Sequence, residues 1–205
     1  MLNKTILAVG ILFMLSCGNS QKKETEEKSG IGKAIEGASN LSKFAKSGEK
    51  MEAQIEKLKK LTPLSKDELK VVIPETIGDF KRKSYSAGNS LADLNSVQAE
   101  YSKGDEKTIS VGVIDGAGES GSAIVSLLAM GLSVDAESES NGTITKNLER
   151  DGVRYSTEET KTDSRVSSSI KFLHKERYAF TLTGEGYSLS DLQAFLKSLD
   201  LSALK

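Results

Sequence analysis

The chain has 205 residues, with 28 basic and 29 acidic side chains and a formal net charge of -1 at pH 7. This near-neutral balance argues against a nucleic-acid-binding protein, which would carry a concentrated basic face. The single cysteine excludes an intramolecular disulfide, a Cys-based zinc site and a CxxC redox pair, so the fold must depend on its hydrophobic core.

The first predicted element is an export signal over residues 1–16. Lys4 supplies a positive charge, residues 5–15 form an apolar run too short to span a bilayer as a helix, and small Ser16 precedes Cys17. The motif Met14-Leu15-Ser16-Cys17 resembles the lipobox of bacterial lipoproteins. The resemblance implies that the Cys17 thiol is diacylated, with palmitate as an expected acyl group, and that Cys17 becomes the new N-terminus. An ordinary secretory signal and an uncleaved apolar anchor are the alternatives.

Two segments are expected between the signal and the domain. Residues 17–30 are polar and dense in charge, which predicts a solvated, lipidated tether, either a plain spacer or a surface-export tag. Residues 31–61 place apolar side chains three and four apart, which predicts an amphipathic helix with a break near Ser47-Gly48. This helix would dock on the domain, form a coiled coil or lie on the membrane; docking or partial disorder fits the irregular spacing best.

The domain is expected to cover residues 62–205. Ser65 and Glu68 match a capping box, so a short helix should begin there and end before Pro74. Beyond it the apolar residues alternate with polar ones, which is typical of half-buried antiparallel strands joined by short polar turns. The predicted strands are residues 80–86, 96–102, 107–114, 143–149, 153–160, 166–173 and 177–183.

Two further helices complete the prediction. One covers residues 121–132, and the other is a terminal helix capped by Ser188 and Asp191. We therefore expect an α+β fold: an antiparallel, meandering sheet of about six or seven strands, with a crossover helix and a C-terminal helix on one face, preceded by the amphipathic helix.

One stretch looks like a chemical motif. Gly116, Gly118 and Gly121 follow a strand and precede a helix, the setting of a dinucleotide-binding G-x-G-x-x-G loop. The preceding strand alternates and is not doubly buried, no repeated βαβ units follow, and Asp115 and Glu119 place negative charge where a phosphate would lie. We interpret the glycines as a strand-to-helix crossover and expect no cofactor.

The remaining candidates are isolated. His174 is the only histidine and is predicted in an exposed hairpin turn, without partners for a metal site or a catalytic triad. Ser167, Ser168 and Ser169 lie along a strand without a nucleophile elbow. Glu137 and Glu139, like Glu158 and Glu159, do not follow calcium-loop spacing and are interpreted as solvated charge. Asn141-Gly142 is interpreted as a turn.

These observations leave two classes of function. The first is a membrane-anchored envelope lipoprotein with a non-enzymatic binding or assembly role, held at a membrane by Cys17, with an envelope protein as its possible partner. We expect it at the outer membrane, on the periplasmic or the surface face. The alternative is a lipid-anchored hydrolase or small-ligand carrier whose site is assembled from scattered residues; a deep pocket lined by Asp115, Glu119 and Ser120 would favour it.

Overall fold

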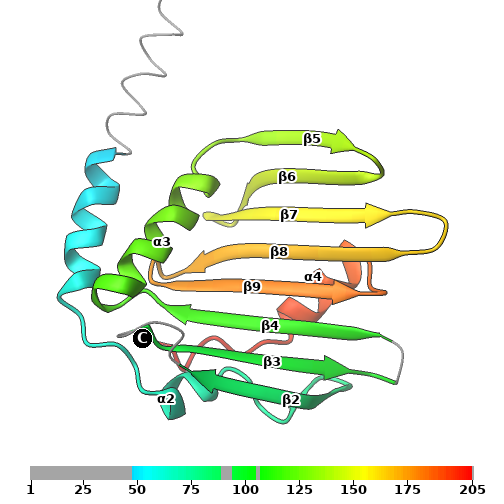
Figure 1. Cartoon of the computed structure of the whole chain (residues 1–205), viewed down its shortest axis with the longest axis horizontal. Helices are drawn as coiled ribbons and strands as arrows, with labels where there is room; N and C mark the ends of the chain where they lie inside the picture. The colour runs from blue at the N-terminus through cyan, green and yellow to red at the C-terminus, as the bar shows by residue number, and fades with distance from the viewer. Residues whose placement is uncertain (1–47, 89–93, 105–106, 205) are drawn as a thin grey trace, which may run out of the picture. The chain divides into compact units, whose positions relative to one another are not determined.

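A computed structural model describes residues 48–88, 94–104 and 107–204, which belong to the compact unit formed by residues 41–205 (Figure 1). The predicted signal, the tether with Cys17 and the first half of the amphipathic segment lie outside the described residues. Within the described part, no helix has the length and apolar character needed to cross a membrane.

One antiparallel sheet dominates the described part of the chain. Its nine strands are β1 (Thr76–Ile77), β2 (Phe80–Gly88), β3 (Ser96–Ser102), β4 (Thr108–Asp115), β5 (Ala136–Ser140), β6 (Thr143–Arg150), β7 (Val153–Lys161), β8 (Val166–His174) and β9 (Tyr178–Glu185). They lie in the order β1-β2-β3-β4-β9-β8-β7-β6-β5. All seven predicted strands are present, and β1 and β5 raise the number above the expected six or seven.

The alternation of side chains produces this sheet. In β4 every second residue is buried, so Ile109, Val111 and Val113 face the core. A three-residue turn, residues 175–177, joins β8 to β9. Two-residue turns with positive φ at both positions, Asn141-Gly142 and Asp151-Gly152, join β5 to β6 and β6 to β7. Such turns match the right-handed twist of the strands they connect.

Four helical segments accompany the sheet in the described residues. They are a helix over residues 48–59, α2 (Lys66–Lys70), α3 (Gly118–Leu132) and α4 (Leu189–Lys197). The capping box predicted at Ser65 and the N-terminal cap predicted at Ser188 are both formed, each as a capping box with the side chain three residues later. Figure 1 shows α3 crossing one end of the strands on its way from β4 to β5.

The two main helices lie on opposite faces of the sheet, so the prediction of a shared face was wrong. Leu192 and Phe195 of α4 join the main core with Phe180 of β9, whereas Val125 of α3 packs with Ala179 and with Leu58 of the N-terminal helix. Ala179 and Phe180 are neighbours in one strand, and neighbouring side chains in a strand point to opposite faces. The sheet therefore has a large core on the α4 face and a smaller one on the α3 face.

Candidate functional site

A pocket of about 300 Å³ lies between the sheet and α4, over β6, β7 and β8; we call it the α4 pocket. Its volume is at the lower end of the range for small-molecule sites. Apolar side chains from the strands, from α4 and from the segment after α4 line most of it: Leu148, Val153, Tyr155, Ile170, Phe172, Leu196 and Leu201.

The register of the strands explains why this pocket is apolar. Leu148 pairs with Tyr155, Tyr155 pairs with Phe172, and Phe172 pairs with Phe180, so these four side chains form one row on the α4 face. The helix α4 contacts β7, β8 and β9, and the row continues beyond it to β6. Apolar side chains of β6 and β7 therefore form a wall of the pocket that α4 does not fill.

Aromatic rings form the floor of the α4 pocket. The ring of Phe172 lies 5.3 Å from that of Tyr155 and is stacked 4.9 Å from that of Phe180. Such pairs add to the free energy gained by burying the rings and hold them in place. Burial raises the pKa of Tyr155, with a smaller contribution from Asp151. The floor is thus an apolar surface made of rings that pack on one another.

The charged residues of the α4 pocket are exposed at its edge. Arg150 ends β6, Asp151 begins the following turn, and Lys197 lies at the end of α4. In the described part of the chain, none of the three side chains has a hydrogen-bond or ion-pair partner. The edge therefore offers two cationic groups and one carboxylate to a bound molecule.

His174 also lines the α4 pocket, and the prediction of an exposed turn residue was wrong. It is the last residue of β8 and is half-buried, because β8 extends to His174 and the turn to β9 covers residues 175–177. Burial lowers the pKa of His174, as does the charge of Lys175, while a hydrogen bond to the backbone of Leu201 opposes the shift. Its Nε2 atom is buried and has no partner among the described residues.

A larger cavity of about 910 Å³ lies on the α3 face, between the helix over residues 48–59, α3 and two turns of the meander. Met51, Ile55 and Val125 contribute apolar surface, and Lys50 and Lys57 contribute charge. Lys50, one of the residues that line this cavity, is close in sequence to the start of the described part of the chain at residue 48. The α4 pocket is instead enclosed by strands, α4 and the adjoining turns.

Close packing or a positive φ explains why the predicted crossover has glycine at positions 116, 118 and 121. A Cβ atom at Gly116 would lie 2.5 Å from both the Arg177 carbonyl oxygen and Val125 Cγ2, and one at Gly121 would meet the Asp115 carbonyl oxygen. Gly118 has a φ of +80°, which favours glycine. The space beside this loop is thus occupied by the chain itself, as α3 packs closely against β4 and the β8–β9 turn.

Asp115 is fully buried and joins three parts of the fold. Its carboxylate accepts hydrogen bonds from Leu64 N (2.7 Å), Ala117 N (3.0 Å) and the Arg177 guanidinium (2.7 and 2.8 Å). The hydrogen bond to Asp115 raises the pKa of Arg177. Asp115, Glu119 and Ser120 line neither cavity described above.

The other candidates lie apart from the α4 pocket. Ser168 is buried and donates to the Tyr187 carbonyl (3.0 Å), and Glu159 accepts from Leu189 N (2.8 Å) at the start of α4. Glu137 and Glu139 are exposed on β5. Among the described residues, no group of three or more His, Cys, Asp and Glu side chains is placed to hold a metal ion.

The α4 pocket could not be predicted from the sequence, because the residues that line it are far apart in the chain. Its walls come from β6, β7, β8 and α4, and its row of Leu148, Tyr155 and Phe172 depends on strand register. The only sign of the pocket in the sequence was the alternation of apolar and polar residues along each of these strands. Comparison of the chain with protein-family models, with curated proteins and with solved structures finds no match.

Proposed function

We propose that this protein is a membrane-anchored envelope lipoprotein with a non-enzymatic binding role, and that the α4 pocket is its binding site. The observation that carries the proposal is the pocket's construction: a floor of packed aromatic rings, apolar walls and charged groups at the edge. Small-molecule sites in proteins have this character, because apolar surface supplies affinity and a few polar groups supply orientation.

The proposed anchor is Cys17, on the evidence of the lipobox-type motif that ends in it. An acyl group there would hold the domain at a membrane through the polar segment of residues 17–30. A single acyl chain binds membranes only weakly, so the multiple acylation implied by the lipoprotein resemblance would be needed for a stable attachment.

The polar residues that the sequence singled out support a binding role over a catalytic one. Asp115 is taken up by Arg177 and by two backbone N–H groups, and Ser168 donates to the Tyr187 carbonyl. Each of these interactions holds parts of the fold together. The alternative function was a lipid-anchored hydrolase or small-ligand carrier. Of these two, the α4 pocket favours the small-ligand carrier.

A protein partner is the second candidate, because α3 exposes an apolar stripe. Leu127, Met130 and Val134 are 66%, 51% and 55% exposed. The spacing of three places Leu127 and Met130 on one side of α3, and Val134 follows in the bend after the helix. Exposed apolar surface of this kind is typical of a contact with another protein.

In-cell photo-crosslinking tests the binding site. A photoreactive amino acid replaces Leu196, which lines the α4 pocket, and in a matched strain it replaces Ala194, which is exposed on the same helix. We expect a light-dependent adduct at position 196 and none at 194. A small mass increase identifies a ligand and a large one a protein partner, whereas the absence of any adduct at 196 contradicts the proposed site.

The anchor is tested by Cys17→Ala. We expect the variant to lose incorporation of a labelled fatty acid and to move from the membrane to the soluble fraction. Unchanged labelling of the variant refutes lipidation at Cys17.

A further inference from the structure

We propose that the α4 pocket binds a single-chain amphiphile with an anionic head, such as a fatty acid, its acyl chain on the aromatic floor and its head beside Arg150 and Lys197. This inference rests on the proposed binding role and adds the chemical class of the ligand.

The inner part of the pocket suits an acyl chain. Tyr155, Phe172 and Ile170 present continuous apolar surface, and Leu196 faces them from α4. Each methylene group that leaves water for such a surface favours binding. A volume of about 300 Å³ is small for a ligand with several rings or chains and fits one slender chain.

The cationic groups gather at one end of the pocket. Arg150 ends β6 and His174 ends β8, and both strands run antiparallel to β7, so the two residues lie at the same end of the sheet. The helix α4 begins at the other end, where Leu189 N bonds to Glu159, and the segment after it reaches His174 through Leu201. Lys197 therefore lies toward the end that holds Arg150.

The state of Arg150 is the second observation in favour of an anionic head. Arg82, Arg154, Arg165 and Arg177 each bond to an oxygen of the protein, whereas Arg150 has no such partner among the described residues. Lys197 is likewise without a partner there. A guanidinium and an ammonium group beside an apolar pocket match a carboxylate head, since both can donate charge-assisted hydrogen bonds to it.

Two other polar groups at this end are compatible with the proposal. Asp151 adds one negative charge, which leaves the two cations in excess and disfavours a second carboxylate in the ligand. The buried Nε2 of His174 has no partner among the described residues, and a hydrogen bond to a bound molecule would remove the cost of leaving this polar atom unpaired. A cationic head would face Arg150 and Lys197 and would be repelled.

The test uses the full chain, purified as cells make it and placed in lipid nanodiscs, with a dodecanoate that carries a diazirine as the probe. We expect light-dependent adducts on peptides of β7, β8 and α4. Unlabelled dodecanoate should displace the probe at a concentration about tenfold lower than dodecanol, which corresponds to about 1.4 kcal/mol for the charged head. Dodecyltrimethylammonium should be the weakest competitor.

The double variant Arg150→Gln, Lys197→Gln isolates the contribution of the head. We expect it to need about tenfold more dodecanoate for the same displacement, with dodecanol unchanged. The matched control removes two exposed lysines that line neither cavity, Lys81→Gln and Lys171→Gln, and should leave both competitors unchanged.

The outcomes separate the two proposals. Equal displacement by dodecanoate and dodecanol, or an unchanged preference in the double variant, overturns the anionic head and leaves binding in the pocket standing. Adducts scattered over the surface with none in β7, β8 or α4 overturn the ligand class altogether. If an adduct at position 196 in cells then proves to be a protein, the binding role survives with a partner in place of a lipid.

Discussion

Removal of the Asp115 carboxylate should be among the most damaging single changes in the domain. The side chain of Asp115 is 0% exposed and that of Arg177 is 14% exposed, so the pair is shielded from water. The change Asp115→Ala leaves the Arg177 guanidinium without its counter-ion and leaves the N–H groups of Leu64 and Ala117 without their acceptor.

The expected magnitude follows from this burial. Removing one partner of a buried ion pair costs about 3–5 kcal/mol of the free energy of unfolding, because the other charge stays in a medium of low polarity. For a domain of this size the melting temperature changes by about 2–4 °C per kcal/mol, which predicts a decrease of roughly 6–20 °C.

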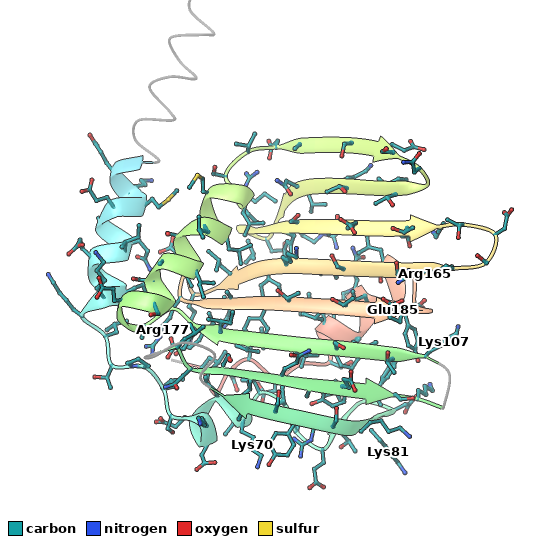
Figure 2. The ribbon with its side chains drawn as sticks, viewed as in Figure 1. Lys70, Lys81, Lys107, Arg165, Arg177 and Glu185 are labelled. Atoms are coloured by element: carbon teal, nitrogen blue, oxygen red, sulfur yellow. The ribbon has the colours of Figure 1, made fainter. Side chains whose placement is uncertain are left out.

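An exposed ion pair in the same sheet provides the control. Arg165 and Glu185 are 64% and 50% exposed and lie at the end of the strands opposite Arg177 (Figure 2). Because water screens such a pair, Glu185→Ala should cost no more than about 1 kcal/mol. Urea unfolding followed by circular dichroism gives both free energies, and a cost for Asp115→Ala no larger than that for Glu185→Ala would falsify the reasoning.

Two further predictions concern α3 and His174. In the same assay, Gly116→Ala should lower the free energy of unfolding by about 1–3 kcal/mol, because its Cβ atom would press on the Arg177 backbone and on Val125. Gly131→Ala has open space around its Cβ atom and should leave the free energy of unfolding unchanged or raise it by up to about 1 kcal/mol. Equal effects of the two changes would contradict the packing argument. Burial lowers the folded-state pKa of His174 below its ordinary value of 6.5, so its contribution to stability is fully present above that pH and decreases as the pH falls toward the folded-state value. Unfolding measured from pH 7 to pH 5 should show a weaker dependence in His174→Gln than in the unchanged chain, and identical curves would refute the assignment.

The sequence was sufficient for most of the fold. Alternation revealed seven strands, and the capping residues Ser65 and Ser188 marked the starts of two helices. The strand β5 was missed because all five of its residues are exposed, so neither face carries an apolar pattern. The strand β1 was missed because it has only two residues.

The arrangement of the helices was harder to predict because α3 uses the less apolar face of the sheet. The signal was present where apolar residues are adjacent in a strand, as in Tyr178-Ala179-Phe180 of β9, since one of the neighbours must face away from the main core. The candidate site was harder still. Its walls are far apart in sequence, and the position of His174 depended on the placement of a three-residue turn, which covers residues 175–177 and not 174–176.

The pairing of β4 with β9 has a consequence for the timing of folding. Residues 108–115 form a ladder with residues 178–185, and the whole of α3 and the β5–β8 meander lies between them in the chain. Closing such a long loop is entropically costly, so this ladder should form late, and until then both strands have an unpaired edge. A chain emerging in order from a ribosome or a translocation pore cannot complete its central ladder until β9 is free. The chain therefore stays exposed to aggregation, or to binding by a chaperone, until residues 178–185 have emerged.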